Sequence, residues 1–382
     1  MNKIRPFLYM LLLAFFSIIF KPFSFINKKK IRFFIDRPFG VDNSYFLYNY
    51  VKKHDKSIKS IYLVENEKDK TYKWLEKDKN TVFSLSIKHF WYFIHAENII
   101  ISYDTKPFFF YKEWLLFKYI LKPLAKIIFI QHWVTKAFIK PYSQRYTHFD
   151  LFFCTSKSEK QIIKRLWYSD EQIKITWFPR FDNLFDSNVE KLIMFMPSWK
   201  MELYWKTEEE FKRSDYFKWI NELLLSPKLN NLLEKSTFKL FFVTHYMMNS
   251  YIHLFDIKSK NIQVVNPNLL DKKSDIQHLL KKSSILITDY SSIMFDFAYM
   301  KKPIIHYRFD THHYKELFNV KKDWFWEIIY NTKDVIIKLS EILKNNCVIK
   351  KRYLNNVYNF FQKIDWRNCE RVYTEIKNFN IK

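Results

Sequence analysis

The chain has 382 residues and a formal net charge of +25, and 48% of its residues are hydrophobic. This length and composition allow two globular domains with proper cores and exclude a disordered chain. The positive charge favours polyanionic partners, but no helix-turn-helix, zinc-finger or RNP-like motif is present, so we expect no nucleic-acid partner. Cys154, Cys347 and Cys369 have neither the number nor the spacing of a disulfide framework or a zinc site.

The first 30 residues combine an apolar run, residues 6–20, with the basic residues Lys28, Lys29 and Lys30. A run of about 15 residues is shorter than the roughly 20 that span a bilayer, and no small-residue cleavage site follows it as in a signal peptide. We therefore predict a membrane-association segment at residues 1–30 that lies in the cytoplasmic interface, with its lysines at lipid phosphates. A spanning helix and an ordinary buried first helix are the alternatives.

Short apolar strands then alternate with helices. In chain order, we predict strands at residues 31–35, 60–64, 98–102, 127–131, 151–154 and 173–176, and helices at residues 44–53 and 158–166. A second series of predicted strands covers residues 193–196, 240–243, 262–265, 285–288 and 303–307. This alternation is typical of parallel sheets wound with helices, so we predict an α/β fold. Polar residues break the pattern at about residues 183–191, which gives one domain at residues 31–187 and another at residues 188–382.

Polar residues directly follow several of these predicted strands. His132, His245 and the segment 289–292 are placed in this way. In open α/β sheets, ligands bind at the carboxyl ends of the strands, so these residues are candidates for a site. His312 and His313 are adjacent and cannot both point at one metal from a strand, so we read them as surface residues and expect no metal.

Residues 285–305, ILITDYSSIMFDFAYMKKPII, read as a strand, a polar turn, a two-turn helix and a second strand. Ser291 and Ser292 lie where the helix begins, and its free N–H groups and dipole would favour a phosphate there. Asp296 lies on the same face one turn later and suits a ribose or polyol hydroxyl. The alternative is a helix cap formed by Asp289 and Ser291 without any ligand.

The string LITDYSSIMFDFAYMKKPIIHYRFD resembles the signature of the CDP-glycerol:poly(glycerophosphate) glycerophosphotransferase family of teichoic acid and capsule synthesis. Further similar segments follow in the family's order: IRFFIDRPFGVDNSYFLYNYV, FIQHWVTK, HFDLFFCTSKSEKQII, ITWFPRFDNL, MFMPSWK and NCERVYTEI. The resemblance extends from about residue 31 to the end of the sequence.

The resemblance implies a GT-B fold, in which two Rossmann-like domains face each other across a cleft. It also implies a peripheral enzyme on the cytoplasmic face of the cell membrane. The donor would be CDP-glycerol or a related CDP-polyol, and the acceptor a lipid-linked polymer. A hydroxyl of the acceptor would attack the donor's β-phosphorus and release CMP, without a cofactor or a metal.

The resemblance also implies roles for particular residues. His132 matches the candidate general base, since an imidazole suits hydroxyl deprotonation near neutral pH. His245 matches a second catalytic histidine that neutralises the phosphate or leaving group, although Val243 and Tyr246 depart from the family's pattern beside it. For both, a purely structural histidine is the alternative. The substrate-binding residues that the resemblance implies are Thr288, Asp289, Ser291, Ser292, Asp296, Lys200 and Arg180.

Lys200 stands where the family tends to have arginine, and a lysine neutralises phosphate but loses the bidentate geometry. Arg180 is placed near the crossover between the two domains. Two other functions stay open: a GT-B glycosyltransferase that uses a nucleotide sugar, and a non-catalytic membrane-bound relative. The sequence also leaves open the polyol, the acceptor, and whether one unit or many are added.

The chain has a single glycine, Gly40, and twelve tryptophans, whereas glycine usually makes up about 7% of a protein. Six tryptophans stand where the family has glycine: Trp133, Trp167, Trp177, Trp324, Trp326 and Trp366. Residue 167 follows a predicted helix at a position that favours a left-handed cap, where glycine costs least. We hypothesise that these residues are glycine in the native protein because its gene uses UGA as a glycine codon. A true replacement by tryptophan is the alternative.

Overall fold

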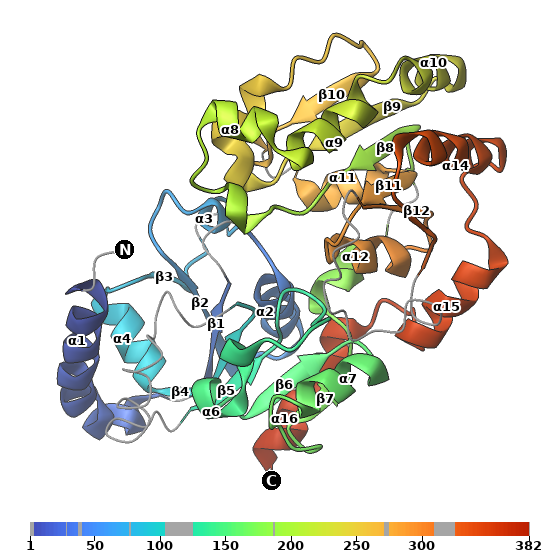
Figure 1. Ribbon diagram of the computed structural model, residues 1–382. Coiled ribbons are helices and arrows are strands. Elements are labelled where there is room, and N and C mark those ends of the chain that lie inside the picture. Colours follow the sequence, from blue (N-terminus) through green and yellow to red (C-terminus); the bar gives the residue numbers. More distant parts are fainter. Residues whose placement is uncertain are drawn as a thin grey trace. The chain divides into compact units, whose positions relative to one another are not determined.

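The computed structural model describes residues 4–27, 29–36, 40–75, 78–103, 125–185, 188–270, 275–308 and 325–381. The chain divides into two compact units (Figure 1). Unit 1 comprises residues 1–183 and 365–382, and unit 2 comprises residues 184–364. The first boundary lies close to the predicted one. Residues 365–382 differ from the prediction, because they belong to unit 1 and not to the second domain.

Unit 1 contains a seven-stranded sheet within the described residues, and each of its pairings is parallel. Its strands, in spatial order, are β3 (Thr81–Phe83), β2 (Ile58–Val64), β1 (Lys30–Ile35), β4 (Ala96–Ile101), β5 (Lys126–Phe129), β6 (Leu151–Cys154) and β7 (Ile173–Ile175). Its helices are α1 (Ile4–Phe20), η1 (Lys21–Ile26), α2 (Asn43–His54), α3 (Lys70–Trp74), α4 (Ile87–Ile94), η2 (Lys140–Tyr142), α6 (Gln144–Thr147), α7 (Lys157–Lys164), η3 (Pro179–Asn183) and α16 (Asn368–Ile381).

Unit 2 contains a six-stranded parallel sheet within the described residues. Its strands, in spatial order, are β10 (Ile262–Val265), β9 (Lys239–Val243), β8 (Leu192–Phe195), β11 (Ile285–Thr288), β12 (Ile304–Tyr307) and β13 (Ile328–Ile329). Its helices are η4 (Met201–Leu203), α8 (Glu208–Arg213), α9 (Asp215–Leu224), α10 (Pro227–Ser236), η5 (Tyr246–Leu254), η6 (Pro267–Leu269), α11 (Ile276–Lys282), α12 (Ile293–Tyr299), α14 (Thr332–Lys344) and α15 (Lys351–Phe361). The prediction of an α/β fold with parallel sheets is confirmed in both units.

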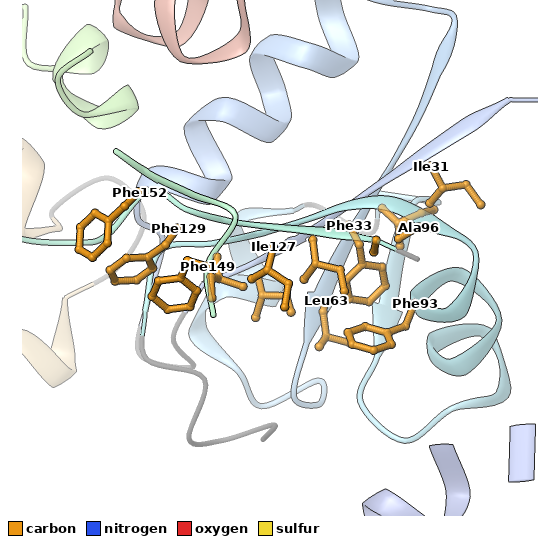
Figure 2. Packing of buried hydrophobic residues seen from close by; sticks show 14 of the residues in the cluster. Ile31, Phe33, Leu63, Phe93, Ala96, Ile127, Phe129, Phe149 and Phe152 are labelled. Carbon is orange, nitrogen blue, oxygen red and sulfur yellow. The ribbon is translucent and has the colours of Figure 1, made fainter. Parts of the chain in front are cut away.

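The strands are apolar on both faces because helices cover both sides of a parallel sheet. In β1, Phe33 packs into one buried cluster and Phe34 into another, since successive side chains point to opposite faces. Figure 2 shows the first cluster, in which Phe33 lies near Leu63 and Phe93. This two-sided burial explains why the strands read as continuous apolar runs in the sequence.

The helix α16 joins unit 1 through specific polar contacts. The carboxylate of Asp182 accepts hydrogen bonds from the backbone nitrogens of Asn368 and Cys369, each over 2.8 Å. The red α16 also packs against α2 (Figure 1). Because the helix begins on an acidic side chain, its first N–H groups are satisfied and its dipole is stabilised.

The apolar N-terminal run forms α1, which lies alongside α4 (Figure 1). Leu13 is fully buried, and the Phe16 ring stacks on Phe90 with centroids 4.7 Å apart. The other face stays apolar and exposed: Ile18 is 76% exposed, and Phe25 in η1 is 79% exposed. Within the described part of the chain, no helix has both the length and the apolar character that crossing a membrane requires.

Three tryptophans have a left-handed backbone. The φ angles are 66° at Trp167, 63° at Trp177 and 58° at Trp366. A bulky L-residue in this region costs about 1–2 kcal/mol, whereas glycine adopts it freely. Three of the six positions in the glycine hypothesis therefore have a backbone that suits glycine. Trp133 and Trp326 do not share this conformation, and Trp324 lies outside the described residues.

Candidate active site

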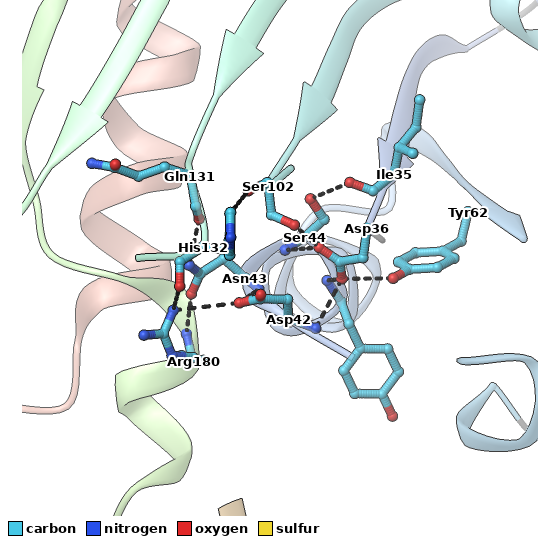
Figure 3. A network of polar contacts seen from close by, with 11 residues as sticks. Ile35, Asp36, Asp42, Asn43, Ser44, Tyr62, Ser102, Gln131, His132 and Arg180 are labelled. Atoms are coloured by element: carbon cyan, nitrogen blue, oxygen red, sulfur yellow. Dashed lines mark hydrogen bonds and ion pairs between the residues drawn. The ribbon is translucent and has the colours of Figure 1, made fainter. Parts of the chain in front are cut away.

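In unit 1, the turn after β5 carries His132. The predicted strand at residues 127–131 ends earlier, because the backbone of Gln131 turns to φ 32°. The ring of His132 is 6% exposed, and its Nδ1 lies 3.2 Å from the backbone oxygen of Ser102 (Figure 3). A carbonyl oxygen can only accept, so Nδ1 carries the proton of the neutral ring. The other nitrogen, Nε2, then carries the lone pair that a general base needs.

Arg180 lies with His132 in unit 1. Its Nη1 donates to the backbone oxygen of His132 over 2.9 Å and to Oδ1 of Asp42 over 3.3 Å (Figure 3). Its guanidinium also stacks over the ring of Phe178. The side chain is 9% exposed, so the structure places it inside unit 1 as a support for the turn that bears His132.

Asp36, which directly follows β1, organises the same region although the sequence did not single it out. Its carboxylate accepts from the backbone nitrogens of Asp42, Ser44 and Tyr45 over 2.9–3.1 Å. It also accepts from the hydroxyl of Ser102, whose carbonyl meets His132 (Figure 3). A polar residue at the carboxyl end of a central strand was the signal that could have identified it.

In unit 2, Thr288 and Asp289 at the end of β11 are fully buried. The Asp289 carboxylate accepts from the backbone nitrogen and the hydroxyl of Ser198, each over 2.7 Å. Burial raises the pKa of Asp289, while the hydrogen bonds from Ser198 act in the opposite direction. The hydroxyl of Thr288 donates to the backbone oxygen of Met196 over 2.6 Å. Both predicted site residues therefore hold the loop after β8 to the end of β11.

The predicted helix after this strand is confirmed as α12, which has seven residues. Ser291 and Ser292 lie before its first residue and are partly exposed. Ser292 is the N-cap residue, and its hydroxyl makes no capping hydrogen bond to the helix. Asp296 is buried within α12. Of these three side chains, only the two serines reach the surface.

Two cationic side chains meet at the ring of Tyr290. The Nζ atom of Lys200 lies 4.8 Å from the ring centroid, and the Cζ atom of Arg308 lies 4.2 Å from it. Both distances are typical of cation–π contacts. Arg308 directly follows β12 and was missed by the sequence analysis, although its place after a strand is the signal that identified other residues. Positive charge is thus concentrated beside Ser291.

His245 follows β9 and caps η5. Its Nδ1 accepts a hydrogen bond from the backbone nitrogen of Met247 over 3.2 Å, so the proton of the neutral ring is on Nε2. The ring stacks on Trp199 with centroids 6.3 Å apart and an interplanar angle of 14°. The two histidines thus have opposite tautomers: His132 presents an accepting Nε2 and His245 a donating Nε2–H.

Aromatic rings crowd His132. The ring of Trp133 lies 3.9 Å from it, and that of Tyr103 lies 4.9 Å from it, measured between centroids. Glycine at residue 133 would remove the nearer ring. Among the residues that the structure describes, no group of three or more His, Cys, Asp or Glu side chains is placed to bind a metal. His312 and His313 lie outside the described residues.

The profile of the CDP-glycerol:poly(glycerophosphate) glycerophosphotransferase family matches residues 14–378. The chain belongs to this family. The minor teichoic acid biosynthesis protein GgaB of Bacillus subtilis (strain 168) is 28% identical to this chain over 377 residues. That alignment covers 93% of this chain and 40% of GgaB, so the chain spans less than half the length of that relative.

Two further comparisons are with teichoic acid polymerases. The teichoic acid poly(glycerol phosphate) polymerase of Bacillus spizizenii is 31% identical over 127 residues, which cover 33% of this chain and 28% of the polymerase. The solved structure of the wall teichoic acid polymerase TagF matches this chain with a TM-score of 0.67 and 16% identity. The match covers 100% of this chain and 99% of the TagF chain, so the two share a fold.

Proposed function

We propose that this chain transfers a glycerol-phosphate or related polyol-phosphate unit from a CDP-activated donor to a teichoic-acid-like or capsular cell-surface polymer, releasing CMP. The family match supports this proposal. A second support is that TagF, which has a similar fold, has been solved after soaking with CDPG. The observation that carries the proposal is the pair of opposite tautomers at His132 and His245. One ring can accept a proton, and the other can donate a hydrogen bond to a phosphate.

In the proposed reaction, Nε2 of His132 takes the proton of an acceptor hydroxyl while the hydroxyl oxygen attacks the β-phosphorus. A new oxygen–phosphorus bond forms, and the bond between this phosphorus and the bridging oxygen breaks. CMP leaves with the electron pair of that bond. His245 donates its Nε2–H to a phosphate oxygen and offsets the developing charge.

We further propose that the donor's phosphates bind beside Tyr290 in unit 2. Lys200 and Arg308 supply positive charge there, and Ser291 and Ser292 add hydroxyl groups. Arg308 provides the planar pair of donors that Lys200 lacks, so it can bind a phosphate in a bidentate manner. Thr288, Asp289 and Asp296 are buried, and in this proposal they shape the site from beneath.

We propose that the exposed apolar face of α1 and η1 rests on the cytoplasmic face of the cell membrane. Leu8, Leu11, Phe15 and Ile18 on α1 and Phe25 on η1 are exposed. Lys21 and Lys29 are exposed beside them, where they can reach anionic lipid headgroups. Such a position would bring the enzyme to a lipid-linked acceptor.

The direct test is CMP release from CDP-glycerol in the presence of a lipid-linked acceptor. We expect turnover by the wild type and a loss of at least about 100-fold in His132→Ala, as for other general bases. The matched control is His54→Ala on α2 of the same unit, which we expect to keep full activity. Turnover with a UDP-hexose instead would favour the glycosyltransferase, and no turnover with either donor would favour a non-catalytic relative.

A further inference from the structure

A buried glutamate supports the turn that carries His132. Glu159 lies in the first turn of α7 and is fully buried. The loop after β6 leads directly into the first turn of α7 and so to Glu159, and the loop after β5 carries His132. Because β5 and β6 are neighbouring parallel strands, these loops meet at the same edge of the sheet. Glu159, at the start of α7, can therefore contact the loop that carries His132.

The two oxygens of Glu159 accept four hydrogen bonds. Oε1 accepts from Nε2 of Gln131 over 2.8 Å and from the backbone nitrogen of Thr135 over 2.6 Å. Oε2 accepts from the backbone nitrogen and the hydroxyl of Thr155 over 2.6 and 2.7 Å. Hydrogen bonds to an ionised acceptor are about twice as strong as neutral ones. Two of the four end on residues that flank His132 on both sides.

The turn also needs support because its backbone is strained. Gln131 has a φ of 32°, in a region that a side chain other than glycine rarely adopts. Such a conformation persists only where surrounding contacts fix it. The side chain of Gln131 is held further by the backbone oxygen of Phe153 and the hydroxyl of Thr135, each over 2.8 Å.

We infer that Glu159 is a positioning residue, which fixes the turn 131–135 and thereby the direction of the His132 ring. The inference rests on the proposed role of His132 as the base. A carboxylate is required because all four partners are donors. A glutamine would direct an NH₂ group at two of them, and an aspartate would keep the charge but fall short by one CH₂ group.

The experiment compares Glu159→Gln and Glu159→Asp with the wild type. Burial raises the pKa of Glu159 to about 7 while its hydrogen bonds act in the opposite direction, so the assay is run at pH 8, where the carboxylate is ionised. We expect kcat for CMP release to fall 10- to 100-fold in both variants. The KM for CDP-glycerol should stay unchanged, because Glu159 is remote from the proposed donor residues in sequence and belongs to the other unit.

Hydrogen exchange gives a readout that does not depend on activity. The amides of residues 131–135 should exchange faster in both variants, because neither glutamine nor aspartate can satisfy all four donors and the hold on the turn is weakened. Asp69→Asn is the matched control: Asp69 is also buried in unit 1 and accepts backbone hydrogen bonds, but it caps α3. We expect wild-type kinetics and wild-type exchange at residues 131–135 in this control.

Normal kcat in the Glu159 variants, or a reduced kcat with unchanged exchange at residues 131–135, would overturn the inference. The failure of the proposed function has a different signature, which is retained activity in His132→Ala. If the glutamine variant does not fold, the aspartate variant still decides, because it retains the negative charge at the same position.

Discussion

Nη1 of Arg180 donates to the backbone oxygen of His132 over 2.9 Å, and both side chains are more than nine-tenths buried. A cation that holds a backbone oxygen orients the residue without touching the substrate. This relationship separates two roles for Arg180: a support for the candidate base, or a contact to substrate as the family resemblance implied.

The substitution Arg180→Lys distinguishes these roles. A lysine keeps the charge but cannot donate to Asp42 and His132 in the same geometry. We expect kcat to fall about 10- to 100-fold with little change in the KM for CDP-glycerol. Steady-state kinetics of CMP release measure this split. An increase confined to KM would instead place Arg180 at the substrate.

Arg308→Ala tests the donor site. Removing a charged group that binds phosphate costs about 1.5–3 kcal/mol, which corresponds to a KM for CDP-glycerol roughly 10- to 100-fold higher. Arg213→Ala in α8 is the matched control, since it removes the same charge from an exposed position of unit 2. Equal effects of the two variants would show that only the overall charge matters.

Glu159 should make stability depend on pH. Burial raises its pKa from the ordinary value of 4.5 to about 7. The folded protein therefore holds this proton more tightly than the unfolded chain. This contribution, roughly 3 kcal/mol at most, is fully present below pH 4.5 and is lost as the pH rises through about 7. Denaturant unfolding of the wild type and Glu159→Gln at pH 5 and pH 8 measures it.

The wild type must be compared with Glu159→Gln, because histidines also titrate between pH 5 and pH 8 and affect both proteins. The wild type should lose stability relative to Glu159→Gln between pH 5 and pH 8. A difference between them that does not change with pH would contradict the raised pKa.

The double variant Ile18→Ser/Phe25→Ser should weaken membrane binding. Each side chain is more than three-quarters exposed, and burying one in lipid is worth about 1.5–3 kcal/mol. We expect at least tenfold weaker sedimentation with vesicles that contain phosphatidylglycerol. Met201→Ser/Leu269→Ser removes two exposed apolar side chains of unit 2 and serves as the control. Equal binding by both variants would refute this docking surface.

The tryptophans at left-handed positions predict glycine in the native protein. Peptide mass spectrometry of the protein from its natural host should read glycine at residues 167, 177 and 366. Tryptophan at these positions would end the hypothesis. In a recombinant protein with the written sequence, Trp167 offers a test of stability because it is 59% exposed and its ring contacts only partly cover it, through Phe138 and Arg145.

Trp167→Gly relieves a strain of about 1–2 kcal/mol and loses a cation–π contact with Arg145 worth about 0.5 kcal/mol. Trp205→Gly is the control, since Trp205 is 88% exposed and is not among the positive-φ residues. We expect the first variant to be more stable than the second by about 1 kcal/mol, measured by thermal unfolding.

Much of the fold could be predicted because buried parallel strands leave a local signal. The bounds of β6, β10 and β11 agree with their apolar runs. The strands β3 and β13 have three and two residues, too few to form a pattern, and they were missed. The placement of α16 in unit 1 depends on Asp182, which lies far away in the sequence, so no local pattern could reveal it.

The candidate site also has a part that local sequence segments reveal and a part that depends on distant residues. His132, His245 and Lys200 could be identified because they follow strands within recognisable segments. The tautomer of His132 could not be predicted, because it depends on the carbonyl of Ser102, thirty residues earlier. The role of Glu159 depends on donors from two separate loops, which only the assembled sheet brings together.

The pairing of α16 with α2 makes unit 1 discontinuous, with unit 2 inserted between its two parts. A ribosome must therefore synthesise all of residues 184–364 before the segment that completes unit 1. Until that segment has been made, unit 1 waits with Asp182 and the surface of α2 still uncovered. During translation, this uncovered surface is where a chaperone would be needed.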